Sequence, residues 1–176
     1  MFEKIETERF ILRNVNNNDR NEIFEILSDD ETVKFLNMEK HNNIEMTDDL
    51  IDEYLIGLEK GEKFPFAIIN KNTNDFIGVI LVKLDLYDED CFEFTIYINK
   101  KYWNQGIYTE IIKPIIKFAF EDVKTGNFRG FVMKRNDASS KVLEKSGFKL
   151  EKVFHVDGIE DDIKSYLITK KEYETR

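Results

Sequence analysis

The chain has 176 residues, of which 41% are hydrophobic and 35% are charged, and its formal net charge is −9. This length fits a single domain over residues 1–176 that buries roughly 70% of the surface of its unfolded chain. The acidic balance argues against nucleic acid as a partner, because phosphate binding needs clustered Lys and Arg, and no apolar run approaches the ~20 residues that span a bilayer.

The first elements expected are a strand over residues 9–15 and two helices. In residues 9–15 apolar and polar side chains largely alternate, and an Asn-rich turn follows. In the first helix Ile23, Ile26 and Leu27 share one face. In the second helix Thr47 is the expected N-cap and Gly61 the expected end.

The middle of the chain predicts three strands, joined as antiparallel hairpins, over residues 64–70, 75–83 and 91–98. A long helix over residues 106–122 follows. Pro114 within it should kink the axis at a cost of about 3 kcal/mol unless packing compensates. The last elements expected are a strand over 128–133, a helix over 138–145 that ends at Gly147, and strands over 148–154 and 163–169.

This order of elements predicts an α/β (α+β) fold in one domain. The sheet is expected to be mixed and mostly antiparallel, with helices on both faces. The N-terminus lacks the basic start and apolar stretch of a signal peptide. Cys91 is the only cysteine, which excludes an internal disulfide. A cytoplasmic location is therefore expected.

The segment from Trp103 to Thr109 has the pattern of a small anion site. It follows a strand, contains Gly106 and leads into a helix. The first amides of a helix have no internal partner, and the helix dipole adds about half a positive charge there. A diphosphate would bind well to such amides, and a glycine lets the backbone come close. An ordinary turn is the alternative, and the glycine patterns of P-loops and dinucleotide folds are absent.

Three segments together resemble the ribosomal-protein (RimJ/RimL-like) branch of the GNAT superfamily of N-acetyltransferases. Residues 6–13 (ETERFILR) are similar to the opening of that branch, and residues 93–110 (EFTIYINKKYWNQGIYTE) to its cofactor segment. Residues 136–148 (NDASSKVLEKSGF) are similar to its last motif. The three segments occur in the order and spacing of the family and cover nearly the whole chain.

The resemblance implies acetyl-CoA (coenzyme A) as the cofactor. Backbone amides from Gln105 to Thr109 would hold the diphosphate, and Tyr97 and Ile98 would pair with the pantetheine arm as a neighbouring strand does. Asn136 and Ser139 would contact the far side of the cofactor, although Asn136 could instead cap the helix. The expected cofactor-binding residues are Tyr97, Ile98, Trp103, Asn104, Gln105, Gly106, Ile107, Tyr108, Thr109, Asn136 and Ser139.

Two residues depart from the pattern of the family. Asn104 replaces its usual first glycine, and Tyr108 stands where the family has Ala or Gly. A tyrosine at this position could crowd the diphosphate, point away from it, or reach the cofactor with its hydroxyl.

Acetyl transfer to an amine requires a neutral amine. A primary amine with a pKa near ~10.4 is only about one part in 2,500 neutral at pH 7, so a base is useful. Glu93 is the candidate base because it matches an acidic position of the family, and a solvated surface role is the alternative. Ser139 or Tyr108 could protonate the leaving thiolate, since Val142 and Leu143, where many relatives have a tyrosine, cannot.

Cys91 is not expected to be a nucleophile, because no His is near it in sequence. His155 is expected in a strand with a structural role. Two His and one Cys without ligand spacing predict no metal site.

Acceptor specificity is expected from residues 85–90 and from the segment between the first two helices, including Phe35, Leu36, Met38 and His41. The acidic turn over residues 88–90 could attract an amine, or it could be a solvated hairpin tip. The net acidity is compatible with a cationic substrate, and it could equally serve only solubility.

The sequence thus predicts an acyltransferase that moves an acetyl group from acetyl-CoA to a primary amine by direct attack in a ternary complex. The amine could belong to a peptide N-terminus, a small amine or an antibiotic. A non-catalytic module that binds acyl-CoA or a protein is the alternative, and the chain is expected to be a monomer or a homodimer.

Overall fold

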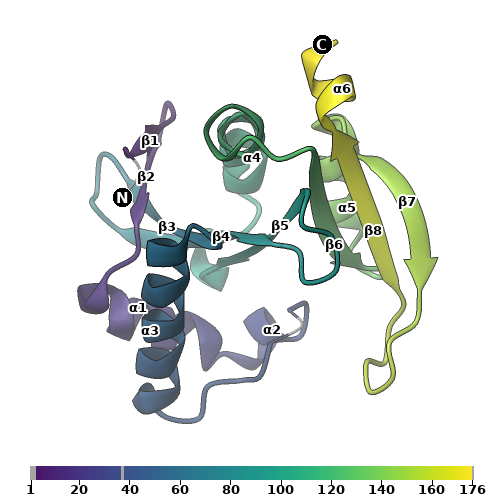
Figure 1. The fold of residues 1–176 in the computed structure, drawn as a ribbon. Coiled ribbons are helices and arrows are strands. Elements are labelled where there is room, and N and C mark those ends of the chain that lie inside the picture. Colours follow the sequence, from purple (N-terminus) through teal and green to yellow (C-terminus); the bar gives the residue numbers. More distant parts are fainter. Residues whose placement is uncertain (1–2, 37, 176) are drawn as a thin grey trace. The chain divides into compact units, whose positions relative to one another are not determined.

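The computed structural model describes residues 3–36 and 38–175 (Figure 1). Its strands are β1 (Ile5–Glu6), β2 (Phe10–Asn14), β3 (Lys63–Asn70), β4 (Phe76–Leu84), β5 (Cys91–Ile98), β6 (Asn127–Met133), β7 (Lys149–Phe154) and β8 (Ile163–Thr169). Its α-helices are α1 (Arg20–Leu27), α2 (Asp30–Val33), α3 (Ile44–Lys60), α4 (Ile107–Lys117), α5 (Asp137–Lys145) and α6 (Lys170–Glu174). Two 3₁₀ turns occupy Asn17–Asp19 and Lys100–Tyr102, and a π-helical turn occupies Phe118–Val123.

The chain forms two compact units. The first contains Met1–Lys83 and Thr95–Ile107, and the second contains Leu84–Phe94 and Tyr108–Arg176. Strand β5 therefore gives its first four residues to the second unit and its last four to the first.

In the first unit β2, β3 and β4 are neighbouring antiparallel strands, with Leu12 opposite Ile68 and Phe66 opposite Ile80. Side chains alternate between the two faces of such strands. One face packs with α1 and α3 into a core that contains Val15, Ile23, Ile26, Leu27, Ile51, Tyr54, Ala67, Ile69, Val79, Leu81 and Tyr97. Leu12, Phe66 and Ile68 on the other face are also fully buried. Burial on both faces explains why β3 has a nearly continuous apolar sequence.

In the second unit β5 and β6 run parallel, whereas β6–β8 and β7–β8 are antiparallel pairs. The predicted mixed and mostly antiparallel strand pairing is therefore confirmed. The rings of Phe94, Phe128 and Phe148 pack together, with centroids 5.1 to 5.9 Å apart. Gly130 makes room for this cluster, because a Cβ there would lie 2.9 Å from the Phe94 ring and 3.2 Å from Leu143 of α5. Phe94 and Tyr97, three residues apart in β5, point to opposite faces of the strand.

The start of α3 differs from the prediction. Asn43, not Thr47, is the N-cap, and its side chain accepts a hydrogen bond from the Met46 amide at 3.1 Å. Thr47 lies inside the helix, fully buried, with its hydroxyl 2.8 Å from His41 Nδ1. Gly61 ends the helix as predicted, in a left-handed conformation at φ 73°.

Other details were not predicted or were predicted wrongly. Strand β1 and helices α2 and α6 are too short to produce a periodic pattern. His155 was expected in a strand, but it lies one residue after β7 and is exposed, with Nδ1 3.5 Å from Asp162. Helix α4 continues past Pro114 as predicted, but it then passes into a π-helical turn that was not expected.

Candidate functional site

The first feature of the site is the edge of β5. The pairs of β5 with β6 that lie within the second unit run from Cys91 opposite Asn127 to Phe94 opposite Gly130, and β5 extends to Ile98. Backbone groups of an extended strand point alternately to its two edges. The last part of β5 can therefore offer hydrogen bonds to an extended ligand.

Two contacts show which backbone groups of β5 face β4. The Asn99 amide donates to the Ile77 carbonyl at 2.9 Å. A Cβ added at Gly78 would overlap the Tyr97 carbonyl oxygen, so these strands meet closely only because residue 78 is glycine. The backbone groups of Tyr97 therefore point to β4, and those of Ile96 and Ile98 point to the opposite edge.

The loop after β5 is held by its own side chains. Trp103 donates from its indole Nε1 to the Ile98 carbonyl at 2.8 Å, and Gln105 donates from Nε2 to the Lys101 carbonyl at 3.2 Å. Lys100 pairs with Asp29 at 2.5 Å, and Asn99 donates to Glu25 at 2.8 Å, so α1 and the start of α2 also anchor the turn. These bonds fix the path of the chain into α4.

The same loop contains two left-handed residues, Asn104 at φ 60° and Gly106 at φ 70°. Asn adopts this conformation more readily than other residues with a Cβ. That explains how Asn104 can stand where the family has glycine. A Cβ on Gly106 would meet only Arg9 Nη2, at 3.8 Å, so this glycine is required by its φ angle and not by crowding.

Helix α4 begins directly after Gly106 at Ile107. Ile107 is buried, so it can offer only its backbone to a ligand, whereas Thr109 is exposed. The amides of the first helical turn have no partner within the helix and lie at the positive end of its dipole. The loop and this turn therefore form a row of donors suited to a diphosphate.

Tyr108, the second residue of α4, is half-buried and packs edge-on against Phe94, with ring centroids 6.5 Å apart. Burial raises the pKa of its phenol well above the ordinary value. A phenol with a raised pKa is a weak proton donor, so the structure argues against Tyr108 as the acid for a thiolate.

Glu93 is half-buried on β5, and its Cα partner in the parallel ladder is Arg129 of β6. Arg129 Nη1 lies 2.5 Å from the buried Asp85, and its Nε lies 3.4 Å from Glu151. Cys91, on the same face of β5, is fully buried, and burial raises the pKa of its thiol to about 12. The face of Glu93 is thus a charged network instead of an open, solvated surface, and Cys91 is protonated near neutral pH.

Asn136 is the N-cap of α5, as the alternative interpretation expected. Its side-chain oxygen accepts a hydrogen bond from the Ser139 amide at 3.2 Å. The side-chain amide nitrogen of Asn136 is not used by this cap. A contact of Asn136 or Ser139 with the cofactor stays a prediction.

Three of the four residues named for acceptor specificity, Phe35, Met38 and His41, belong to different environments. His41 is buried against Thr47, and burial lowers the pKa of its imidazole. Met38 packs against the core of the first unit. Lys34 Nζ lies 5.0 Å from the centroid of the half-buried Phe35 ring. The position of His41 favours a structural role, in which it ties the chain before α3 to that helix.

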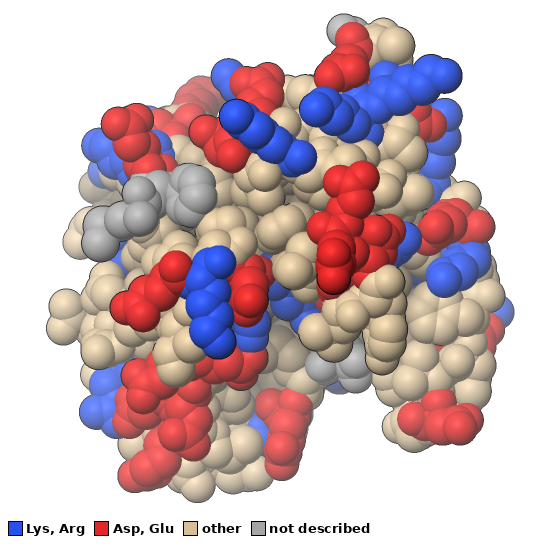
Figure 2. Space-filling view, in the orientation of Figure 1, with Lys and Arg blue, Asp and Glu red and all other residues tan. Residues whose placement is uncertain are grey.

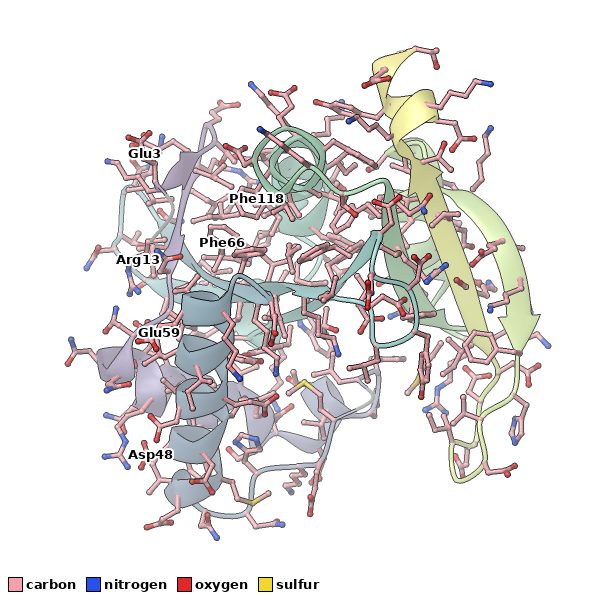
Figure 3. The ribbon with its side chains drawn as sticks, in the orientation of Figure 1. Glu3, Arg13, Asp48, Glu59, Phe66 and Phe118 are labelled. Carbon is pink, nitrogen blue, oxygen red and sulfur yellow. The ribbon has the colours of Figure 1, made fainter. Side chains whose placement is uncertain are left out.

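Acidic side chains are concentrated in the helical part of the first unit. From Arg20 to Glu62, thirteen Asp and Glu stand against four Lys and Arg, which gives a net charge of −9, equal to that of the whole chain. Figure 2 shows acidic side chains gathered over α3, and Figure 3 marks Asp48 and Glu59 toward the two ends of this helix. A surface of this sign raises the local concentration of cations.

Sequence reasoning missed Gly78 and Arg129, and it assigned Asp85 to a loop for acceptor specificity without its ion pair with Arg129. A glycine inside the apolar run of β4 was a usable signal of close backbone approach, and a lone arginine inside the strand NFRGFVM was a signal of a paired charge.

Over residues 3–36 and 38–175, no group of three or more His, Cys, Asp or Glu is arranged to hold a metal ion. In the same part of the chain, no helix is both long and apolar enough to cross a membrane.

Comparison with known proteins adds to this geometry. A family model described as an acetyltransferase (GNAT) domain matches residues 9–149, a stretch that runs through both units. An uncharacterised N-acetyltransferase of Bacillus subtilis (strain 168), YoaA, is 26% identical over 97% of this chain and 98% of its own length.

Two solved structures share the fold. A spermidine N-acetyltransferase from Vibrio cholerae, in complex with CoA and spermine, matches with a TM-score of 0.81 at 18% identity, over 94% of this chain and 98% of its own. A ribosomal-protein-S5-alanine acetyltransferase from Vibrio fischeri matches with a TM-score of 0.83 at 16% identity, over 98% and 99% of the two chains.

Proposed function

The chain belongs to the GNAT family of acetyltransferases, and we propose that it transfers an acetyl group from acetyl-CoA to a primary amine by direct attack in a ternary complex. The observation that carries this proposal is the continuity of one segment. The last residues of β5 lead, through a loop with two left-handed residues, directly into the first amides of helix α4.

The residues present fit coenzyme A. Ile96 offers its amide and carbonyl, and Ile98 its amide, on the edge of β5 to the extended pantetheine arm and its thioester. This replaces the expected pair of Tyr97 and Ile98. The amides from Asn104 to Thr109 offer donors to the diphosphate. Acetyl-CoA supplies, when bound, an acyl group activated as a thioester.

The Ile98 amide is the best placed donor for charge that develops on the thioester oxygen. The amide of Tyr97 points to β4, whereas that of Ile98 points to the edge that we assign to the cofactor. A fixed backbone donor of this kind stabilises developing negative charge without reorganisation. The Ile98 carbonyl, already bonded to Trp103, helps to hold that peptide in place.

Glu93 is the proposed base. Its carboxylate would accept a proton from the ammonium form of the acceptor, directly or through one water molecule. Arg129, the Cα partner of Glu93 on β6, is held in place by Asp85 and Glu151. A thiolate with a pKa near ~8.5 can leave without an acid, so Ser139 is not required as a donor.

The acceptor that we propose is a cationic amine, either a polyamine or the N-terminus of a basic peptide. Support comes from the acidic charge of residues 20–62 and from the likeness to an enzyme solved with spermine. We place this reaction in the cytoplasm, because the only cysteine is a buried thiol.

The test is release of free thiol from acetyl-CoA in the presence of spermidine, spermine, basic and acidic N-terminal peptides, and an aminoglycoside. We expect stabilisation by acetyl-CoA in a thermal unfolding assay, and thiol release with one of the cationic amines. Stabilisation without thiol release for any amine would support the alternative of a binding module. Absence of stabilisation would contradict the cofactor assignment itself.

A further inference from the structure

Arg9, in the turn before β2, reaches the cofactor loop 96 residues later in the chain. Its Nη1 donates a hydrogen bond to the Gln105 carbonyl oxygen at 3.0 Å. Its guanidinium carbon lies 4.9 Å from the centroid of the Phe10 ring, so the side chain rests on an apolar surface. The backbone of Arg9 is fixed as well, since its carbonyl accepts from the Lys71 amide at 2.9 Å. Both residues of this contact belong to the first unit.

This hydrogen bond determines the orientation of one peptide group. The peptide unit between Gln105 and Gly106 is planar and trans, so its C=O and N–H point in opposite directions. The Gln105 carbonyl oxygen points to Arg9, and the Gly106 N–H therefore points away from Arg9. Nη2 of Arg9 would also be the nearest atom to a Cβ at Gly106, at 3.8 Å, which confirms that the guanidinium lies beside this peptide.

The other bonds of the loop do not set this peptide. Trp103 bonds to the Ile98 carbonyl and Gln105 bonds through its side chain to the Lys101 carbonyl. They fix the loop before residue 105. The 105–106 peptide joins Gln105 to Gly106, which is left-handed, and Asn104 just before it is left-handed too. Because glycine has few steric restrictions, this peptide could rotate and turn its carbonyl oxygen toward an anion, which would repel it.

We propose that Arg9 is a positioning residue for the diphosphate of coenzyme A, because its bond to the Gln105 carbonyl keeps the Gly106 amide directed at the phosphate. The inference rests on the proposed function, since it assumes that the loop binds this cofactor. Arg9 acts here through the peptide group. The bond also keeps the Gln105 carbonyl oxygen, which carries a partial negative charge, turned away from the anion.

The test is a calorimetric titration of wild type and variants with three ligands. Coenzyme A has the diphosphate and a 3′-phosphate, dephospho-CoA has only the diphosphate, and pantetheine has neither. Arg9→Gln should weaken binding of both nucleotides to the same extent, about 10- to 100-fold, because the Gly106 amide, a donor to a charged group, is no longer held toward the phosphate. Binding of pantetheine, titrated at millimolar concentration, should not change.

Two variants complete the design. Arg9→Lys, which keeps a cationic donor, should recover part of the loss. Lys71→Gln is the matched control, because Lys71 bonds to the Thr7 carbonyl in the same segment without contacting the loop, and it should bind all three ligands like wild type. If Arg9→Gln does not fold, Arg9→Lys is used instead. Weaker binding of coenzyme A and dephospho-CoA by Arg9→Lys, with unchanged binding of pantetheine, would then support the inference.

Three results would overturn the inference. Equal losses for nucleotides and pantetheine would mean that Arg9 only maintains the fold. A loss for coenzyme A but not for dephospho-CoA would mean that Arg9 contacts the 3′-phosphate. Unchanged affinity for both nucleotides in either Arg9 variant would mean that the 105–106 peptide keeps its orientation without the Arg9 hydrogen bond. A wild-type chain that binds none of the three would instead refute the proposed function.

Discussion

Replacement of Gly106 by valine separates the conformational role of this glycine from its role in binding. Gly106 has a φ of 70°, and a Cβ there would meet no atom closer than 3.8 Å. The cost in the free protein therefore comes from the left-handed backbone alone, about 1–2 kcal/mol, with a β-branched residue at the upper end. For a chain of this size that corresponds to a fall in Tm of about 2–8 °C.

The expected effect on the cofactor is larger. A valine side chain beside the amides of the loop would keep the diphosphate from at least one donor. Each hydrogen bond to a charged group contributes about 1.5–3 kcal/mol, so the Kd for coenzyme A should rise roughly 10- to 150-fold per lost bond. Titration calorimetry with coenzyme A and differential scanning calorimetry without it measure the two effects separately.

Gly158 provides the matched control. It lies in the β7–β8 connection with a φ of 87°, and a Cβ there would have no neighbour within 4 Å. Gly158→Val should lower Tm by a similar amount and leave the Kd for coenzyme A unchanged. If Gly106→Val binds coenzyme A as Gly158→Val does, the diphosphate does not lie at this loop, and the reasoning from the helix start is refuted.

Three further predictions concern single groups. Glu93→Gln should lower kcat/KM about 10²- to 10⁴-fold at pH 7, and the deficit should shrink toward pH 10, where the amine is neutral without help; an equal deficit at all pH values would make Glu93 structural. Tyr108→Phe should keep most of the thiol release, because the raised pKa of the buried phenol makes it a poor acid; a large loss would restore Tyr108 as the donor. Burial lowers the pKa of His41, so the folded state binds a proton less readily than the unfolded state. The free energy of unfolding should then decrease as the pH falls below about 6.5, and His41→Gln, compared with wild type in urea titrations at pH 7.5 and 5.0, should reduce that dependence.

Local features of the sequence determined most of the elements and the cofactor loop. Alternation of apolar residues predicted β5 and β8 with their observed bounds. Gly61 and Gly147 were predicted as helix ends, and both have positive φ angles that favour glycine. The loop was predictable because its chemistry is local: a strand end, a glycine and the unpartnered amides of a helix start are neighbours in the chain.

Tertiary structure decided what depends on residues that are distant in sequence. No local pattern shows that the start of β5 pairs in parallel with β6, because the paired residues are more than 30 positions apart in sequence. The N-cap of α3 is Asn43 instead of Thr47, because the helix already begins at Ile44, and Thr47 within it contacts the buried His41. The pairs Arg129–Asp85 and Arg9–Gln105 join distant parts of the chain, so folding alone brings them together. The sequence thus predicted which loop would hold a cofactor, and the folded chain decided which backbone groups of β5 face away from β4 and which side chains hold the loop.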